Sequence, residues 1–454
     1  MNVDPTQPPV KWDTLWYPLP MVGSPGAHSP HPTSSFDSGD RDPGEAKSTA
    51  VQKAAGEVSR ILAEHADHHD RAGTLPVEGL EAAGRAGLLT VTAARRYGGT
   101  ELGIQSTARL LAELGQGDPS AALVICMTLL HHAFQAAEPT WPEQLYRRTL
   151  TDPAGAPILV NTLRVEPELG TPARGGLPAT TARRTDDGWL LSGRKIYSTG
   201  SHALTWMAVF ARTDEPTPRV GTFLVHHDAD LRASPSLSTS PGIQVVPTWD
   251  HLGLRATVSH DIVLTDVLVP FDAVVDLIEP GTGPAHASAG PMAGWSLLLP
   301  ALYLGVARAA LDWLVRFLQT RTPSSLGAPL STLPRFQTAV GELQARILTA
   351  EELIFGLAGR IDGGDTEAVG RAGVVKTVAC RELIAAVQEA VALVGNPGLT
   401  RANPLQRHLR DILCSRVHTP QDDAVLLGLG RAVFSAGAPV APERPATSDQ
   451  GSVR

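Results

Sequence analysis

The stretch of the chain richest in chemically active side chains is RDILCSRVHTPQDD, which begins at Arg410 in a largely apolar sequence. His418 is its side chain best suited to proton transfer, because an ordinary imidazole has a pKa near 6.5. Arg410 and Asp411 are predicted to form a structural ion pair. Asp422 and Asp423 are predicted to cap or solvate the next helix, whose first turn favours acidic side chains. By itself, His418 fits a hydrogen-bonded loop histidine as well as a catalytic one.

Two further groups of residues are of types that can bind metals, but neither has the spacing of a metal site. The cluster EHADHHD, residues 64–70, falls on what should be an exposed first helix, where a solvated face is the simpler interpretation. Cys126, Cys380 and Cys414 are far apart and form no CxxC, so neither a disulfide framework nor a zinc site is encoded. Three such cysteines fit a reducing cytosol.

Composition excludes several classes of function. The chain has 454 residues and a formal charge of −8, with scattered arginines, so a nucleic-acid partner is not expected. No apolar run approaches the roughly 20 residues that span a bilayer, and no basic region followed by an apolar stretch opens the chain. Neither GxGxxG nor GxxxxGK[ST] is present, so a nucleotide cofactor would bind in another way. We expect a cytoplasmic protein without a membrane partner.

The elements that must position these residues change in type along the chain. Apolar residues recur at helical spacing between 46 and 155, β-rich runs divided by Gly, Pro and Asp fill 156–277, and helical spacing returns over 288–436. The Pro-, Ser- and Gly-rich ends, 1–45 and 437–454, are predicted to be a disordered extension and a flexible tail. The sequence therefore predicts an α+β multidomain fold: a helical domain, a β-barrel or sandwich, and a second helical domain.

Several segments together resemble the acyl-CoA dehydrogenase superfamily in order and spacing. They are YGGTELG, DPSAALV, GRKIYSTGS, TWDHLGLRATVSHDIVLTDVLVP and GNPGLTRANPLQRHLRD, and the match extends over roughly residues 50 to 435. The resemblance implies an N-terminal helical domain, a middle β-domain and a C-terminal four-helix bundle. It also implies FAD between the middle and C-terminal domains, and a homodimer or homotetramer.

The resemblance implies a set of flavin-binding positions. Tyr197 falls where the family stacks an aromatic ring on the flavin, and Thr199 where a hydroxyl meets the flavin N5 edge. A hydroxyl suits N5, which accepts a hydrogen bond when oxidised and donates one when reduced. Read alone, both residues would be ordinary strand residues. The other positions implied are Arg164 and Thr171 around a Val165–Pro167 run that replaces Thr-Glu-Pro, Arg321 toward the pyrophosphate of a partner subunit, and Gly395 and Gly398 in an altered glycine loop.

The family's catalytic glutamate is missing. Counting from Asp411 places Thr419 at the common position, and Trp295 falls at the alternative one, so neither site holds a carboxylate able to take an α-proton. The superfamily's flavin monooxygenases resemble this chain in having a histidine here, which makes His418 the candidate for proton handling. A second histidine from the N-terminal domain is expected near Thr128. His131 and His132, one turn further along the same helix, are the candidates.

Three hypotheses follow from the resemblance. The first is a dehydrogenase that oxidises an acyl thioester by hydride transfer to FAD and passes electrons to an electron-transfer flavoprotein. The second is a two-component monooxygenase that takes reduced FMN or FAD from a flavin reductase and uses O2 on a small aromatic, sulfur or nitrogen compound. The third is a catalytically silent flavoprotein. Thr199 and His418 argue against the third, and the missing glutamate favours the second.

Overall fold

The structure is a computed structural model that describes residues 43–153, 155–169, 176–232, 240–280 and 293–436. The predicted tail at 437–454 lies outside these residues, as does the predicted extension apart from 43–45, which begin the first helix. Thr171 also lies outside them. Helical, β-rich and helical parts follow one another, so the predicted order of the fold is confirmed.

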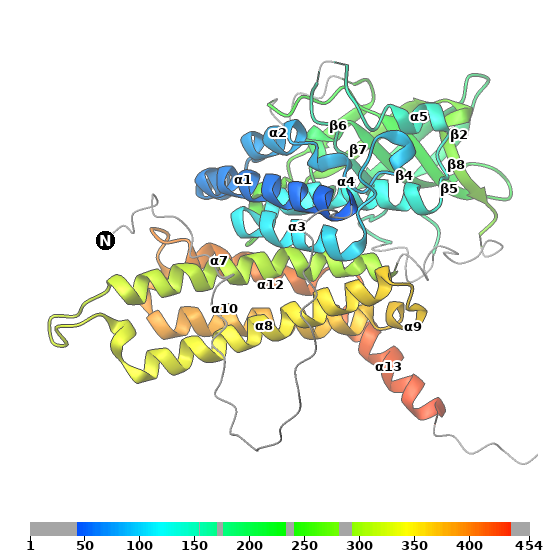
Figure 1. The fold of residues 1–454 in the computed structure, drawn as a ribbon. Helices are drawn as coiled ribbons and strands as arrows, with labels where there is room; N and C mark the ends of the chain where they lie inside the picture. The colour runs from blue at the N-terminus through cyan, green and yellow to red at the C-terminus, as the bar shows by residue number, and fades with distance from the viewer. Residues whose placement is uncertain (1–42, 154, 170–175, 233–239, 281–292, 437–454) are drawn as a thin grey trace, which may run out of the picture.

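The N-terminal part is helical because apolar residues recur on one face of each segment. Its third helix packs on the first and fourth helices on one side and on the C-terminal helices on the other, as Figure 1 shows. Asp118 begins the fourth helix and accepts a hydrogen bond from Ser120 N at 2.7 Å. The helices are α1 (Pro43–Ala72), α2 (Val77–Arg85), α3 (Ile104–Gly117), α4 (Pro119–Ala137) and α5 (Glu143–Arg147), with short helices η2 (Leu88–Thr90) and η3 (Arg95–Tyr97).

The middle part is a mixed sheet. Within the described residues its order is β6-β7-β3-β2-β4-β5-β8, and β1 pairs with β4. Strands β3 and β7 are antiparallel, and Lys195 faces Ile262 at the end of β3. The strands are β1 (Val160–Leu163), β2 (Thr181–Arg184), β3 (Trp189–Lys195), β4 (Trp206–Thr213), β5 (Val220–His226), β6 (Ile243–Val246), β7 (Asp261–Val269) and β8 (Val274–Ile278), with short helices η5 (Ser201–Ala203), η6 (Arg255–Thr257) and η7 (Phe271–Ala273).

The C-terminal part is a helical bundle joined tightly to α3. A Cβ on Gly305 would lie 2.2 Å from Ala112 O, and one on Gly115 would lie 2.2 Å from Leu302 O, so small residues let the two helix backbones touch. The helices are α7 (Leu298–Thr320), α8 (Pro334–Asp362), α9 (Thr366–Val369), α10 (Ala372–Val394), α11 (Asn396–Leu399), α12 (Leu405–Leu413) and α13 (Asp422–Ala436), with short helices η8 (Ala293–Leu297), η9 (Leu330–Thr332) and η10 (Cys414–Arg416).

Two helical stretches are long and apolar enough to cross a membrane, namely α4 and residues 293–320. They are 72% and 83% buried within the fold, as expected for the core helices of a folded bundle. Helix α13 differs from them because it extends beyond the end of the bundle, as Figure 1 shows.

Candidate active site

The end of β3 is fixed by a buried ion pair. Lys195 Nζ lies 2.5 Å from Glu166 Oε1 and donates to Phe210 O, and both charged side chains are almost fully buried. Burial alone would raise the pKa of Glu166, but hydrogen bonds from Lys195 and Thr180 hold it below its ordinary value. Because Ile196 N also donates to the carbonyl of residue 165, the 164–167 loop is tied to the residues that follow β3.

Arg164 lies on the same loop, and its side chain faces the sheet. Its guanidinium lies 4.8 Å from the centre of the Phe210 ring, and burial lowers its pKa. Arg164 thus contacts Phe210 on β4, and its role toward a cofactor stays a prediction.

Tyr197 stands at the surface in a costly backbone conformation. Its φ is 56°, in the left-handed region, and 56% of its area is exposed. Its ring meets Trp249 and His251 edge-on at 6.2 and 6.1 Å, while Trp249 and His251 stack on each other at 3.5 Å. These three residues, called the aromatic platform below, leave an open apolar face at the end of β3.

Thr199 is held by side chains from three segments. Asn161 Nδ2 on β1 donates to Thr199 O at 3.1 Å, and Thr199 Oγ1 lies 3.1 Å from Ser259 Oγ. Ser259 Oγ lies 2.7 Å from Thr257 Oγ1, which donates to Leu254 O at 2.9 Å. Thr199, Ser259 and Thr257 therefore form a continuous hydroxyl chain that ends on Leu254.

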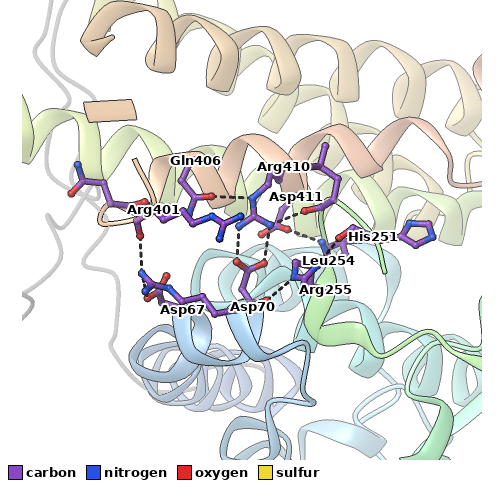
Figure 2. Close-up of polar contacts among 12 residues, drawn as sticks. Asp67, Asp70, His251, Leu254, Arg255, Arg401, Gln406, Arg410 and Asp411 are labelled. Atoms are coloured by element: carbon purple, nitrogen blue, oxygen red, sulfur yellow. Dashed lines mark hydrogen bonds and ion pairs between the residues drawn. The ribbon is translucent and has the colours of Figure 1, made fainter. Parts of the chain in front are cut away.

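The loop carrying the platform is clamped to the C-terminal helices (Figure 2). Leu254, whose φ is 51°, donates its N–H to Asp411 Oδ1 at 2.7 Å. Arg410 Nη1 donates to Leu252 O at 2.7 Å and to Asp70 Oδ1 at 3.0 Å, so it joins the loop to α1. Burial raises the pKa of Asp411 to about 7. The predicted ion pair between Arg410 and Asp411 is therefore wrong, because each group turns to a different partner.

Part of the EHADHHD cluster belongs to this clamp instead of facing solvent. His69 and Asp70 are buried, and His69 Nε2 lies 2.9 Å from Glu78 Oε2. Arg255 Nε donates to Asp70 O at 2.8 Å. The expectation of a fully solvated face was wrong for these two residues, since the end of α1 packs against α12 and the loop. Within the described part of the chain, no group of three or more His, Cys, Asp or Glu side chains is arranged to hold a metal.

His418 follows α12 and η10 and points into the bundle. Its Nε2 lies 2.7 Å from the hydroxyl of Tyr303, a fully buried residue of α7. Burial, together with the nearby Lys376 cation, lowers the pKa of His418 to about 4. Asp422 lies 3.5 Å from Lys376 Nζ and accepts from Arg381 Nε at 3.2 Å, which fastens the segment just beyond the histidine. At neutral pH the imidazole is uncharged.

The two positions of the missing glutamate hold no acid. Thr419 is exposed and Trp295 packs against the core. The acids nearest along the chain have other roles: Asp411 binds the Leu254 amide, and Asp422 pairs with cations at the start of α13. Asp423, also in that first turn, accepts from Ala424 N at 2.9 Å.

His131 and His132 are buried among aromatic rings. The ring of His131 lies 4.4 Å from that of Trp141, and His132 Nδ1 lies 3.2 Å from the Tyr146 hydroxyl. Burial lowers the pKa of His132 to about 3 and that of His131 well below its ordinary value. Thr128 hydrogen-bonds the backbone of β1 instead. Among the described residues, the contacts of both histidines stay within this aromatic group and include neither Thr199 nor His418.

The remaining predicted cofactor residues follow two helices of the bundle, α7 and α10. Arg321 is exposed directly after α7, free to meet a group outside the chain. Gly395, which follows α10, has φ 66° and ψ −133°, and a Cβ there would meet nothing within 4 Å. A Cβ on Gly398 would lie 3.0 Å from Val394 Cγ2, so Gly398 packs against the end of α10. Their roles toward a cofactor stay predictions.

Several residues of the site were missed from sequence. Ser259 and Thr257 lie within the motif TWDHLGLRATVSHDIVLTDVLVP. Their spacing of two is a signal that could have placed both hydroxyls on one face of an extended segment. Trp249 and His251 carry a weaker signal, as two aromatic residues two positions apart in the same motif. Tyr303 lies in the apolar run ALYLGVARAAL and gives no signal at all.

Comparison with known proteins agrees with this architecture. Three domains of the acyl-CoA dehydrogenase family match this chain in order. The N-terminal domain matches residues 45–137, the middle domain 164–267 and the C-terminal domain 297–422. A putative acyl-CoA dehydrogenase of Bacillus subtilis, YdbM, is 30% identical over 383 residues, which are 84% of this chain and 96% of the relative. L-evernosamine nitrososynthase of a Micromonospora species is 28% identical over 383 residues, covering 80% of this chain and 84% of the relative.

A solved structure shares the same fold. KijD3 in complex with FMN and a dTDP-linked amino sugar superimposes with a TM-score of 0.71 at 24% identity, covering 88% of this chain and 96% of KijD3. The predicted family is confirmed by three consecutive domain matches and by a relative that aligns along nearly its whole length. The chain belongs to the acyl-CoA dehydrogenase family.

Proposed function

We propose that this chain is a flavin-dependent monooxygenase that uses reduced flavin and O2 to oxygenate a small aromatic, sulfur- or nitrogen-containing molecule. The observation that carries the proposal is the pairing of His418 with Tyr303, at the place where a dehydrogenase of this family needs a carboxylate. The direction of that hydrogen bond makes His418 a donor and not a base.

The direction follows from the surroundings of Tyr303. Its hydroxyl is fully buried, burial raises its pKa well above the ordinary value, and within the described residues its bonded partner is His418 Nε2. A buried O–H left without an acceptor would cost about 1–3 kcal/mol, so Tyr303 donates to Nε2. A neutral imidazole that accepts at Nε2 carries its proton on Nδ1. His418 therefore presents an N–H donor, which suits binding an oxygen atom better than taking an α-proton.

The surface at the end of β3 suits a flavin. The exposed ring of Tyr197 and the 66% exposed side chain of Leu252 leave an apolar face that a flat ring system would cover. Thr199, two residues after Tyr197, is partly exposed. A Cβ at Gly395 would meet nothing within 4 Å, so the backbone there has open space beside it in which a longer cofactor could lie. These residues fit reduced FMN, or FAD whose pyrophosphate would reach Arg321 of a second subunit.

Each residue then has a separate task. Bound reduced flavin supplies the two electrons that O2 takes up. Tyr197 would stack on the bound ring, Thr199 would meet its N5 edge, and His418 would donate a hydrogen bond from Nδ1 to oxygen on the substrate side. The bond from Tyr303 holds the imidazole in this tautomer, as hydrogen bonds to the second nitrogen do for functional histidines generally. The loop clamp at Leu254 keeps the two halves of the site together.

Dehydrogenation of an acyl thioester is the second candidate. The 30% identity to YdbM, named as a putative acyl-CoA dehydrogenase, favours it. In that reaction the α-proton would have to pass to a neutral His418 whose free lone pair already faces Tyr303. Electrons would then leave through an electron-transfer flavoprotein, whereas the monooxygenase requires a flavin reductase.

One experiment separates the two reactions. Purified protein is supplied with FMN or FAD and either a flavin reductase with NADH in air, or an acyl-CoA panel without oxygen. The monooxygenase predicts that a responsive substrate incorporates oxygen from labelled O2 and lowers the release of hydrogen peroxide. Anaerobic bleaching of the bound flavin by an acyl-CoA, with no oxygen incorporation from any compound, would refute the proposal.

His418 provides the sharper test of mechanism. His418→Ala should lower the yield of oxygenated product per NADH at least about tenfold while flavin binding stays unchanged, because only the donor is lost. His68→Ala, which removes an exposed histidine of α1, is the matched control. Equal yields in both variants would remove His418 from the reaction.

Association of two or more copies is also part of this proposal. Helix α13 exposes a row of large apolar side chains, which a monomer would leave in water. Arg321 stands free after α7, in agreement with a cofactor contact made across an interface. The exposed large apolar residues of α13 are Leu426, Leu427, Leu429, Val433 and Phe434, of which Phe434 is 82% exposed.

A further inference from the structure

The hydroxyl chain behind Thr199 has one direction in which each of its three hydrogens meets an acceptor within the chain, and that direction starts from the bond of Thr257 to Leu254. Thr257 Oγ1 donates to the carbonyl of Leu254, which has no hydrogen to give. With its single hydrogen used there, Thr257 must accept from Ser259 at 2.7 Å. Ser259 has then used its hydrogen as well, so at 3.1 Å it must accept from Thr199. The hydrogens all point from Thr199 toward Leu254.

Thr199 is left with lone pairs and no free hydrogen on its accessible side. Ser259 and Thr257 are buried, so water does not compete for their hydrogens, whereas Thr199 is partly exposed. The chain also ends on a fixed acceptor, because Asp411 holds the amide of Leu254 at 2.7 Å, as Figure 2 shows. A ligand atom that meets Thr199 Oγ1 therefore finds an acceptor.

We infer that Ser259 and Thr257 make Thr199 a selector for reduced flavin. The inference rests on the proposed function, which places the flavin N5 edge against Thr199. Reduced flavin carries a hydrogen on N5 and can donate to Thr199, whereas oxidised flavin has a lone pair on N5 that meets the lone pairs of the hydroxyl. Two buried hydroxyls that touch no ligand thus act as positioning residues for cofactor choice, through Thr199.

The role suits an enzyme that receives its flavin already reduced. A preference for the reduced form would capture the product of a separate reductase and release the flavin after it is oxidised. Reversing the direction of the chain should cancel the preference, because a freed Thr199 hydrogen could then be given to oxidised N5.

The test measures two dissociation constants by titration with FMN, one for oxidised FMN in air and one for dithionite-reduced FMN under anaerobic conditions. Wild-type protein should bind reduced FMN more tightly. Ser259→Ala frees the hydrogen of Thr199, and the ratio of the two constants should fall by about five- to tenfold, the worth of one neutral hydrogen bond. Ser201→Ala is the matched control, because its buried hydroxyl donates to Val258 O at 2.7 Å outside the chain.

The outcomes separate this inference from the proposed function. An unchanged ratio in Ser259→Ala, or an equal change in Ser201→Ala, would overturn the inference, and so would tighter binding of oxidised FMN by the wild type. Should Ser259→Ala fold poorly, Thr257→Val breaks the same chain one step later and should lower the ratio in the same direction. A reduced-flavin preference in a protein that oxygenates nothing would leave the inference standing while the proposed function failed.

Discussion

The pKa of His418 is the property that most directly tests how its environment works. Burial together with the Lys376 cation lowers it to about 4, against 6.5 for an ordinary imidazole. Between these two values the unfolded chain binds more protons at this site than the folded one. Folding stability contributed by this residue is therefore constant above pH 6.5 and falls as the pH drops toward 4.

The size of the effect can be calculated from the two pKa values. At about 1.36 kcal/mol per pKa unit, the residue should cost about 2 kcal/mol of unfolding free energy when the pH falls from 7 to 5. Solvent at the exposed edge of the ring reduces this figure. Several other histidines are also buried, so the total acid sensitivity of the protein does not isolate His418.

The assay must therefore measure the protonation of His418 alone. Deuterium exchange at the ring carbon of histidine depends on protonation, and trypsin releases residues 417–431, whose only histidine is His418. Titrating native protein should give a midpoint near 4, while the same peptide from urea-unfolded protein should titrate near 6.5. Lys376→Met removes the cation and should raise the native midpoint, but not to 6.5, because burial is the larger cause. A native midpoint near 6.5 would refute the buried, neutral imidazole on which the proposed mechanism depends.

Three further substitutions test other parts of the structure. Arg410→Gln should lower the free energy of unfolding by about 3 kcal/mol because it leaves the buried Asp70 carboxylate unpaired, whereas the exposed Arg346→Gln should cost less than about 1 kcal/mol in the same urea titration. Phe434→Glu should shift the protein toward smaller assemblies in size-exclusion chromatography with light scattering, and an unchanged mass would remove α13 from the interface. Lys195→Met should destabilise by about 3 kcal/mol by stranding a buried glutamate, which a thermal melt measures and an unchanged melting temperature would contradict.

The order of helical and β-rich parts was predictable because periodicity is a local property. Apolar spacing switches from the helical to the strand pattern and back, and each change lies close to an observed boundary between elements. Tyr197 and Thr199 read alone as strand residues, but β3 ends at Lys195 and both lie in the segment that follows it.

Partners distant in sequence were not predictable. Arg410 was paired with its neighbour Asp411, yet its carboxylate partner is Asp70, 340 residues away. Adjacent residues on a helix point in different directions, so sequence proximity was a poor guide. His418 was identified, but Tyr303 was not, because a tyrosine in a buried helix looks like any other core aromatic until the fold places a histidine against it.

Membership of the family leaves two reactions open, because close relatives carry the names of both dehydrogenases and a nitrososynthase. The proposal distinguishes the reactions by the direction of two hydrogen bonds as well as by the missing glutamate. In the proposed arrangement Tyr303 donates to His418, which leaves a donor on the other ring nitrogen, and Thr199 donates to Ser259, which leaves an acceptor on Thr199. A dehydrogenase needs a base at the first position and gains from a donor to oxidised N5 at the second. The proposed arrangement has the opposite polarity at both positions, which is the reason to test oxygenation first.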